Sequence, residues 1–457
     1  MIETKRRQLL VLIATILGSS IVILDGTIVT LALPKIAVQL HAGFSALQWI
    51  VDGYTLALSA LILLGGSLGD ILGRKRVYVA GLISFGAASL LCAVAPNATM
   101  LVIFRILQGI GGALMVPGAL SIINTNFPRA IRGKAIGQWT AWGSVAPVLG
   151  PLLGGLILDA TTWRWIFLIN VPLLVVCGLL AMSSIVESKD ESPRHIDGYG
   201  AAIGAVALAA LTFGLIQGPV EHWGILSVAA LVVGVFASVL FVWFESKTRD
   251  PMVRLSLFKS RNFTGSNFMT FAMYGALSGF FFALVIYLQT HMGYSSLKAG
   301  FSSLPVSIIM FLFAGKAGSL SAKYGARMFM TVGPLLAAVG IGWLYFLRPG
   351  DSYAFGVFPG ILLFSIGLAT TVAPLTMTVM ASVSDAQSGI ASGINNAVSR
   401  AAGLIVIATL GLFGSAHIYA FAVVLCAGLA ACAGVLSFIL IRKPPAVDET
   451  DIMPHLT

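Results

Sequence analysis

The feature that most constrains this chain is a repeated pattern of long apolar stretches joined by short basic loops. Residues 63–79 show it clearly: an apolar stretch ends in a glycine-rich turn with one acid, Asp70, and three consecutive bases from Arg74 to Arg76. Another long apolar stretch follows at once. About twenty apolar residues cross a bilayer core of roughly 30 Å, and basic loops mark the cytoplasmic surface. The segment therefore predicts a cytoplasmic turn between two transmembrane helices.

The same criterion predicts fourteen transmembrane helices and an all-α membrane protein. The composition agrees, because 58% of the residues are hydrophobic and 10% are charged, whereas a soluble protein carries about 25% charged residues. Soluble folds and nucleic-acid binding are therefore excluded in spite of the net charge of +10. The predicted spans are 9–33, 48–69, 77–95, 99–124, 134–158, 165–186, 198–218, 223–244, 265–289, 296–320, 328–347, 353–380, 387–412 and 418–441.

The basic residues lie mostly in segments that this placement puts in the cytoplasm. Those segments hold 21 of the 27 lysine and arginine residues, whereas the outer loops hold four. This asymmetry is what the positive-inside rule expects. We therefore predict a multi-pass protein of the cytoplasmic (inner) membrane with both termini in the cytoplasm. The first apolar stretch continues past Leu31 without a cleavage site, which predicts a span and not a signal peptide.

Two longer polar segments, 187–197 and 245–261, divide the predicted helices into groups of six, two and six. The two groups of six echo each other. Residues 44–47 (Phe-Ser-Ala-Leu) correspond to 294–297 (Tyr-Ser-Ser-Leu), and the glycine-rich turn recurs with an alanine in place of its acid. A duplicated six-helix unit is typical of transporters whose site lies between the halves. The predicted regions are an N-terminal six-helix bundle over 1–186, a linker with two additional transmembrane helices over 187–261, a C-terminal six-helix bundle over 262–441 and a cytoplasmic tail over 442–457.

Charged residues inside the predicted spans are candidates for function, because a charge near the bilayer centre costs about 3 kcal/mol or more. Asp25 lies in the first span and Arg105 in the fourth. Arg105 requires a partner, for which Asp25 or a backbone carbonyl is expected. Asp25 is a candidate proton carrier, because desolvation favours its protonated form. The alternative is a structural acid satisfied by Thr27 or by a neighbouring helix.

Two further polar sites are open to two interpretations each. Asp52, near the outer end of the second span, is either a rim acid in contact with water or an acid that recognises a cation or admits protons. Asn395, Asn396 and Arg400 lie in the thirteenth span. They form interhelical hydrogen bonds or line a substrate cavity.

Five motifs resemble signatures of the major facilitator superfamily, and specifically of its fourteen-helix drug:proton antiporter branch. The resemblance covers nearly the whole chain and implies the major facilitator fold, in which two six-helix bundles flank two inserted helices. The motifs are Leu24-Asp-Gly-Thr-Ile-Val-Thr-Leu-Ala-Leu-Pro34, Trp49-Ile-Val-Asp-Gly-Tyr54, the turn from Gly66 to Arg76, Arg105-Ile-Leu-Gln-Gly-Ile-Gly-Gly112, and the glycine- and proline-containing stretch from Gly143 to Gly155.

The function implied by the resemblance is proton-coupled antiport that exports lipophilic neutral or monocationic drugs or toxic compounds by alternating access. The fifth motif favours export over uptake. The absence of acids from the C-terminal spans argues against polycationic substrates. The alternatives are a dedicated exporter of an endogenous metabolite, siderophore or antibiotic, and a proton symporter for uptake. An enzyme is not expected, because the sequence has no catalytic constellation and no long extramembrane segment.

The residues and the resemblance together predict three sets of roles. Proton coupling is expected of Asp25, Asp52 and Arg105. Gating is expected of Gly66, Asp70, Gly73, Arg74, Gly150, Pro151 and Gly154. Substrate binding is expected of Asp25, Gln108, Asn395, Asn396 and Arg400. No metal ion or cofactor is expected; the expected partners are a small lipophilic substrate, protons and the lipid bilayer, and the chain is expected to be a monomer.

Two apolar features are predicted to have packing roles. Residues 163–172 suit an anchor at the membrane interface and are assigned no chemistry. A group of aromatic and methionine side chains could form an adaptable pocket wall, but most of them are predicted to face lipid. The group consists of Phe280, Phe281, Phe282, Met269, Met273 and Met310.

Overall fold

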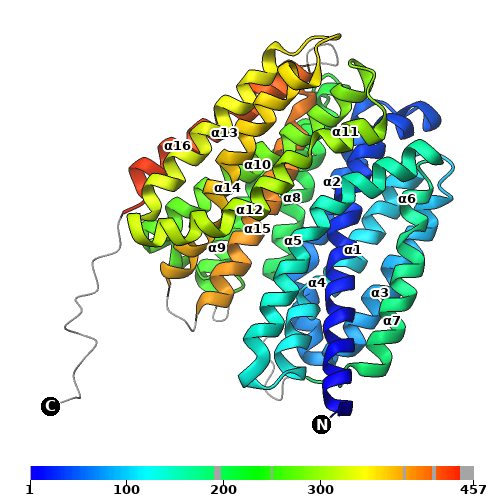
Figure 1. Cartoon of the computed structure of the whole chain (residues 1–457), viewed down its shortest axis with the longest axis vertical. Helices are drawn as coiled ribbons and strands as arrows, with labels where there is room; N and C mark the ends of the chain where they lie inside the picture. Colours follow the sequence, from blue (N-terminus) through cyan, green and yellow to red (C-terminus); the bar gives the residue numbers. More distant parts are fainter. Residues whose placement is uncertain (1, 190–196, 249–250, 384–386, 414–417, 443–457) are drawn as a thin grey trace.

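The computed structural model describes residues 2–189, 197–248, 251–383, 387–413 and 418–442, and all regular structure within these ranges is helical. This confirms the predicted all-α class. In Figure 1 the long helices run side by side in two groups. The predicted tail, 442–457, lies outside the described residues except for its first residue.

The N-terminal group packs around α1 and α4, since α5 and α7 contact α1, while α2 and α3 contact α4. The predicted sixth span is formed by two helices in succession, α6 and α7. The helices of this group are α1 (Ile2–Leu40), α2 (Phe44–Leu72), α3 (Arg74–Ala93), α4 (Ala98–Asn126), α5 (Arg129–Ala160), α6 (Trp165–Leu168) and α7 (Asn170–Ser184).

The C-terminal group packs around α10 and α13, which contact α15, α16 and α14. Several of its spans are completed by short helices of another type. The elements are η1 (Leu255–Lys259), α10 (Arg261–Thr290), α11 (Ser296–Ser302), α12 (Leu304–Tyr324), α13 (Ala326–Trp343), η2 (Leu344–Phe346), η3 (Tyr353–Val357), α14 (Phe358–Ala381), α15 (Ser388–Thr409), η5 (Leu410–Phe413) and α16 (Ile418–Leu440).

The two inserted helices, α8 (Gly198–Val220) and α9 (Ile225–Lys247), pack against each other as a hairpin. Helix α8 also contacts α2 of the first group and α15 of the second. One such contact is between the rings of Trp49 and Phe213, whose centroids are 6.3 Å apart. The inserted hairpin therefore touches both groups along one side of their junction.

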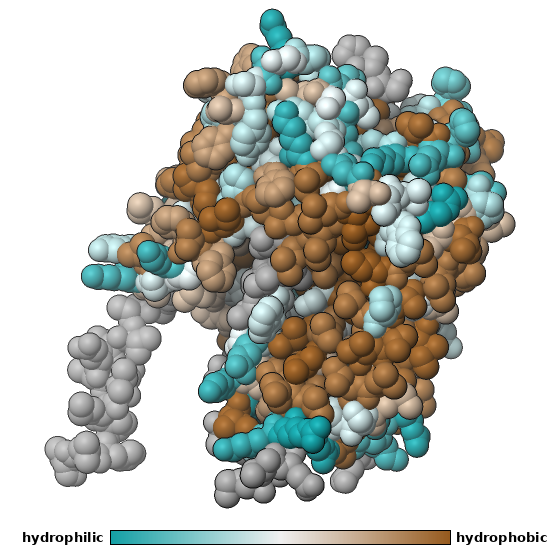
Figure 2. Space-filling model, turned by 45° about the vertical axis from the view of Figure 1, so that its right-hand side comes forward, coloured by the Kyte–Doolittle hydropathy of each residue, from teal (hydrophilic) through white to brown (hydrophobic). Residues whose placement is uncertain are grey.

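Thirteen helices of the described chain are long and apolar enough to cross a membrane. The fifth predicted span lies in α5, for which the apolar stretch found is the shorter Leu149–Ala160. A count of fourteen therefore remains a prediction. Figure 2 shows hydrophobic residues over the middle of the molecule and hydrophilic residues gathered at both ends. Such an apolar belt is the surface of a multi-pass membrane protein.

The two groups are joined at one end of the molecule. In Figure 1 they spread apart toward the end where the N-terminus lies. We call this the inner end and the opposite one the outer end, following the predicted orientation. At the outer end, Gln289 of α10 donates a hydrogen bond to the carbonyl of Leu31 of α1 at 2.9 Å. The carboxylate of Asp159, at the end of α5, accepts from the backbone amides of Ser296 and Leu297 of α11, both at 3.0 Å.

The predicted repeat of the glycine-rich turn is confirmed by backbone geometry. Gly73 has φ and ψ of 111° and 128°, and Gly325 has 95° and 135°. Each glycine donates its amide to the carbonyl four residues earlier, Gly69 in the first copy (3.1 Å) and Ser321 in the second (2.9 Å). Both turns need a positive φ, which glycine adopts without strain.

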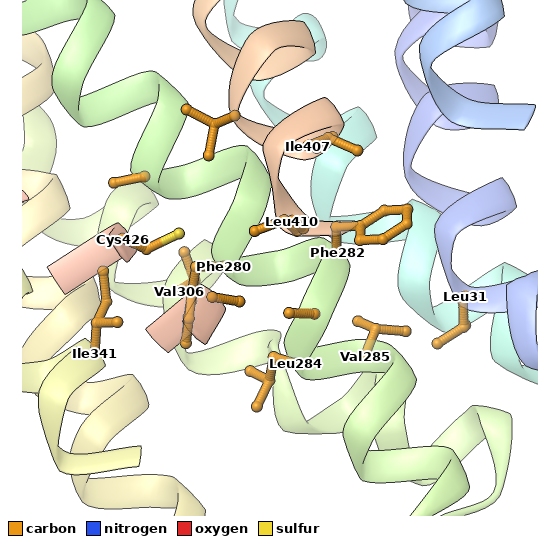
Figure 3. Close-up of a cluster of buried hydrophobic side chains, with 14 of the residues drawn as sticks. Leu31, Phe280, Phe282, Leu284, Val285, Val306, Ile341, Ile407, Leu410 and Cys426 are labelled. Atoms are coloured by element: carbon orange, nitrogen blue, oxygen red, sulfur yellow. The ribbon is translucent and has the colours of Figure 1, made fainter. Parts of the chain in front are cut away.

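Four of the six side chains in the predicted aromatic and methionine group lie inside the protein. Phe280, Phe282, Met269 and Met273 are at most 1% exposed, so the prediction that they face lipid is wrong. Figure 3 shows Phe280 and Phe282 within the buried cluster of the C-terminal group. The ring of Phe282 also meets that of Phe44 of α2, with centroids 5.8 Å apart. These side chains are buried because α10 packs against α14, α15 and α16 and also contacts α1 of the N-terminal group.

Candidate functional site

The polar centre of the N-terminal group is an ion pair between Asp25 of α1 and Arg105 of α4. Both residues are 1% exposed, and Nη1 of Arg105 contacts Oδ2 of Asp25. The predicted contact between these two residues is therefore confirmed. Removing one member of such a pair leaves an uncompensated buried charge, which costs about 3–5 kcal/mol.

The carboxylate of Asp25 accepts two further hydrogen bonds, one from α4 again and one from a third helix, α7. Its Oδ1 accepts from Gln108 of α4 at 2.8 Å and from Asn170 of α7 at 2.9 Å. Gln108 also accepts from Arg105 at 2.6 Å and donates to Ser89 of α3 at 2.9 Å. We call these five residues the Asp25 cluster. Because the carboxylate bonds to α4 and α7 at once, its charge ties three helices together.

Glycines allow α4 to lie close enough to its neighbours to place Arg105 and Gln108. A Cβ on Gly109 would overlap the carbonyl oxygen of Tyr54 on α2, and one on Gly111 would lie 2.6 Å from the backbone nitrogen of Phe85 on α3. Small residues permit such backbone approach between membrane helices. The fourth motif therefore combines the charged side chains with the packing that positions them.

Helix α2 holds the other side of the Arg105 guanidinium. Nε of Arg105 donates to the carbonyl of Ile50 at 3.0 Å, and Cζ of Arg105 lies 4.1 Å from the centroid of the Tyr54 ring. The Tyr54 hydroxyl donates to the carbonyl of Val22 on α1 at 3.1 Å. Both partners predicted for Arg105, a carboxylate and a carbonyl, are present. The aromatic face adds a cation–π contact.

Asn170 and Ser89 are members of the Asp25 cluster that the sequence did not reveal. The purely anchoring role predicted for residues 163–172 is wrong for Asn170, whose amide binds Asp25. Its signal is an amide inside an apolar span, where a polar side chain requires a partner. Ser89 gives no such signal, because a serine in a helix can bond to its own backbone.

Asp52 of α2 lies outside the Asp25 cluster, and it is not the rim acid that one interpretation expected. It is fully buried, and neither carboxyl oxygen has a hydrogen-bond partner in the described structure. Trp49, three residues earlier, contacts Phe213 of α8, and Gln48, four residues earlier, donates to the carbonyl of Ile407 of α15 at 2.5 Å. Asp52 therefore lies where α2 meets α8 and α15. Its lack of partners among the described residues distinguishes it from Asp25, which accepts three hydrogen bonds.

The three polar residues of α15 divide between the two interpretations. Asn395 donates to Thr270 of α10 at 2.7 Å, an interhelical bond within the C-terminal group. Arg400 instead donates through Nε to Oδ1 of Asn396 at 3.2 Å. Both residues lie on the face of α15 that carries Ile407, whose carbonyl accepts a hydrogen bond from Gln48 of α2. Asn396 and Arg400 are therefore directed toward the N-terminal group.

The turn between α2 and α3 carries predicted gating residues at the inner end. Asp70 accepts two hydrogen bonds from Arg74, from Nε at 2.9 Å and from Nη2 at 2.8 Å. Glu187, which follows α7, accepts from two successive amides of α3, beginning with that of Lys75 at 3.0 Å. This carboxylate caps the N-terminus of α3. Glu187 is a further residue that the sequence did not reveal.

The two predicted gating glycines of this turn have different surroundings. A Cβ on Gly73 would lie 2.7 Å from the carboxyl group of Glu187, and the φ of Gly73 is 111°. A Cβ on Gly66 would make an ordinary 3.5 Å contact with Pro117 of α4. Geometry therefore requires glycine at position 73 and permits a larger residue at position 66.

The glycine motif of α5 packs this helix closely against α1. A Cβ on Gly150 would overlap the side chain of Thr27, and one on Gly154 would lie 3.0 Å from Cγ2 of Ile28. Thr27 and Ile28 directly follow the turn of α1 that carries Asp25. The motif therefore contacts the same helix that presents the buried acid.

Another face of α5 packs against α11 of the C-terminal group. A Cβ on Gly155 would lie 2.6 Å from Cα of Leu297, and one on Gly300 would overlap the carbonyl of Pro151. The carboxylate of Asp159 accepts from the amide of Leu297 and from the preceding amide. The α5 motif thus forms a close contact between the two groups at the outer end.

The paired helical groups, the buried acid between helices and the glycine motifs define a membrane transporter. The Major Facilitator Superfamily model matches residues 15–407, and the chain belongs to this family. It is 33% identical over 408 residues to the multidrug resistance protein Stp of Mycobacterium tuberculosis (strain CDC 1551 / Oshkosh), covering 89% of this chain and 76% of that one. It is 30% identical over 410 residues to the tetracenomycin C resistance and export protein of Streptomyces glaucescens, covering 89% and 76%. A solved POT family transporter in complex with a thioalcohol-conjugated peptide shares the fold, with a TM-score of 0.72, 13% identity and coverage of 93% and 94%.

Proposed function

We propose that the protein is a proton-coupled antiporter that exports lipophilic compounds across the cytoplasmic membrane by alternating access, acting as a monomer. The observation that carries this proposal is the Asp25 cluster. A carboxylate buried in the core of one bundle accepts from three donors on two other helices. A single proton on that carboxylate would change the contacts of all three helices.

Protonation of Asp25 would change these contacts in a defined way. An ionised carboxylate only accepts hydrogen bonds, and bonds to it are roughly twice as strong as neutral ones. A proton would remove the charge that attracts Arg105, while Arg105 would keep its bond to the Ile50 carbonyl. Loading and unloading of the acid would therefore loosen and tighten α1 against α4 and α7.

A continuous set of contacts leads from Asp25 to the junction of the two bundles. Thr27 and Ile28 of α1 pack on the glycines of α5, and α5 contacts α11 through Asp159. A shift of α1 would therefore act on the contact that closes the outer end. Rocking of one bundle against the other is the expected motion of a transporter built from repeats.

The remaining predicted residues take supporting roles in this proposal. Gln108 is fully buried and bonds to both members of the ion pair, so it would position Asp25. Asp52 would be a second proton site, because its carboxyl group is buried without a partner. The ion pair between Asp70 and Arg74 would act at the inner gate.

The hydrogen bonds of the Asp25 cluster help to distinguish between a neutral and a cationic substrate. Of the neutral and monocationic classes predicted from the sequence, the neutral class fits better. The three donors on Asp25 leave no free negative charge for a cation. Export rather than uptake is supported by the α5 motif and by the names of the relatives.

The test is transport into inverted membrane vesicles driven by an imposed pH gradient, with the neutral fluorescent probe N-phenyl-1-naphthylamine. Asp25→Asn should abolish the pH-driven component of transport, measured per amount of folded protein in the vesicles. Asp351→Asn, in an exposed loop at the outer end, is the matched control and should transport normally. Undiminished pH-driven transport by Asp25→Asn would eliminate the coupling role of this acid.

A second candidate is a dedicated exporter of an antibiotic, which the name of the Streptomyces glaucescens relative favours. The same vesicles distinguish the two. A dedicated exporter would transport one compound with high affinity and ignore structurally unrelated probes. Competition of N-phenyl-1-naphthylamine transport by unrelated lipophilic drugs would instead support broad drug export.

A further inference from the structure

Arg400 carries a charge that the described structure leaves uncompensated. None of the four ion pairs among the described residues includes it. Its one side-chain hydrogen bond there runs from Nε to Asn396. A guanidinium has five N–H donors, so the terminal nitrogens of Arg400 are available to a ligand. Arg105, by contrast, is neutralised by Asp25.

The position of Arg400 follows from the face of α15 that meets α2. Gln48 of α2 donates to the carbonyls of Ile407 at 2.5 Å and Ala408 at 3.2 Å, near the outer end. Arg400 lies seven residues before Ile407, which is two helical turns toward the inner end on the same face. Helices α2 and α15 contact each other. Arg400 therefore lies at the junction of the two bundles.

This face of α15 is accessible where Arg400 and Asn396 lie. Asn396 is exposed and Arg400 is partly exposed. Figure 1 shows the two bundles spreading apart toward this end of the molecule. Asn395, the neighbour that bonds to α10, provides the contrast, because its amide already donates to Thr270 and Asn267.

We infer that Arg400 and Asn396 bind the acidic group of a lipophilic substrate, such as a carboxylate, a sulfonate or an ionised phenol. The inference rests on the proposed function, because it names a substrate class for the same junction. A guanidinium is weakly hydrated and forms paired hydrogen bonds with oxyanions, and the amide of Asn396 supplies a further donor. A cation at this place would meet the free charge of Arg400 and would find Asp25 already paired.

A purely structural role is not supported by the contacts of Arg400. Its hydrogen bond to Asn396 lies within one helix and joins no two elements. Replacing Arg400 by glutamine should therefore leave the fold intact. This property makes the residue suitable for a binding experiment.

The experiment compares two fluorescent probes with the same anilinonaphthalene skeleton. One is 1-anilinonaphthalene-8-sulfonate, an anion, and the other is the neutral N-phenyl-1-naphthylamine. Binding is titrated at neutral pH with the full chain in phosphatidylcholine nanodiscs, and the signal of empty nanodiscs is subtracted. Neutral lipid removes anionic headgroups as a competing source of acidic groups. The variants are Arg400→Gln and Arg400→Lys, with Arg348→Gln, in an exposed loop at the outer end, as the control for net charge.

We expect the wild-type protein to bind the sulfonate more tightly than the neutral probe. Arg400→Gln should weaken sulfonate binding by about tenfold, since a hydrogen bond to a charged group is worth at least that factor. It should leave binding of the neutral probe unchanged, and Arg400→Lys should retain part of the preference. Arg348→Gln should alter neither affinity.

Equal affinities of the wild-type protein for the two probes would overturn the inference. So would an equal loss of both probes in Arg400→Gln, which would indicate a structural role. The titration uses no proton gradient, so its outcome is independent of the coupling role of Asp25. A failure of the proposed antiport would instead appear in the vesicle assay with Asp25→Asn.

Discussion

The N-terminal and C-terminal groups of helices, here called bundles, are built alike but differ in how their charged side chains are paired. In the N-terminal bundle the buried Arg105 has an acidic partner, because Asp25 pairs with it and accepts two amides as well. In the C-terminal bundle Arg400 has no acidic partner among the described residues. A buried pair can respond to a proton, whereas a lone guanidinium keeps its charge at every physiological pH. Under the two proposals, proton chemistry belongs to the N-terminal bundle and recognition of a fixed charge on the substrate belongs to the C-terminal bundle.

The two glycine-rich turns at the inner end also share a backbone geometry and differ in charge. Gly73 and Gly325 share a positive φ, so the duplicated backbone is preserved. The side chains differ between the two turns, because Ala322 stands where the first copy has Asp70. Asp70 pairs with Arg74, and that ion pair has no counterpart at Ala322, which lacks a charge. The two turns thus share a backbone geometry and differ in their charged side chains.

The largest expected effect comes from removing one arginine from each bundle. Arg105→Met should destabilise the protein by about 3–5 kcal/mol, because it leaves Asp25 as an uncompensated buried charge. Arg400→Met should change stability by less than about 1 kcal/mol, because its bond lies within one helix. Thermal unfolding of the purified variants in detergent measures both. Equal losses of stability would contradict the claim that Arg105 and Arg400 differ in how their charges are paired.

A double variant measures the energetic coupling between Asp25 and Arg105. Asp25→Asn together with Arg105→Met removes both buried charges. Its loss of stability should be smaller than the sum of the two single losses, since groups in one network are not additive. Additive losses would mean that the two side chains do not depend on each other.

The next effect concerns the membrane potential and depends on both proposals. Export of a monoanion in exchange for one proton moves two charges, whereas export of a neutral compound moves one. Each charge contributes about 2.3 kcal/mol per 100 mV. The accumulation of 1-anilinonaphthalene-8-sulfonate in proteoliposomes should therefore depend on an imposed potassium diffusion potential twice as steeply as that of N-phenyl-1-naphthylamine. The same dependence for both probes would count against an anionic substrate.

Sequence reasoning predicted the features that depend on local pattern. The spans follow from apolar length, the Asp25–Arg105 contact follows from the cost of two buried charges, and the close packing of Gly150 and Gly154 follows from small residues in a helix. Each of these predictions concerns either a single helix or a buried charge that requires a partner of opposite charge. They therefore need no knowledge of the tertiary arrangement.

The features that the sequence did not reveal depend on which helices become neighbours. Asp52 is buried because α8 and α15 cover this part of α2, and nothing in the second span indicates that. Asn170 reaches Asp25 only because α7 packs on α1. Phe280 and Phe282 are buried because α10 lies inside its bundle, although their helix is as apolar as one that faces lipid.

The smallest expected effect concerns the contact between the bundles at the outer end, to which they also contribute unequally. The N-terminal bundle supplies a side-chain charge, Asp159, and the C-terminal bundle supplies the backbone amides of Ser296 and Leu297. A carboxylate at a helix N-terminus is worth about 1 kcal/mol. Asp159→Asn should therefore raise the population of molecules open at the outer end severalfold. Spin labels at positions 161 and 298, on the two sides of the contact, would report this as a larger fraction of long distances. Because an amide keeps one acceptor oxygen, complete opening is not expected. An unchanged distance distribution would show that the close packing of α5 on α11, and not the charge of Asp159, holds this end together.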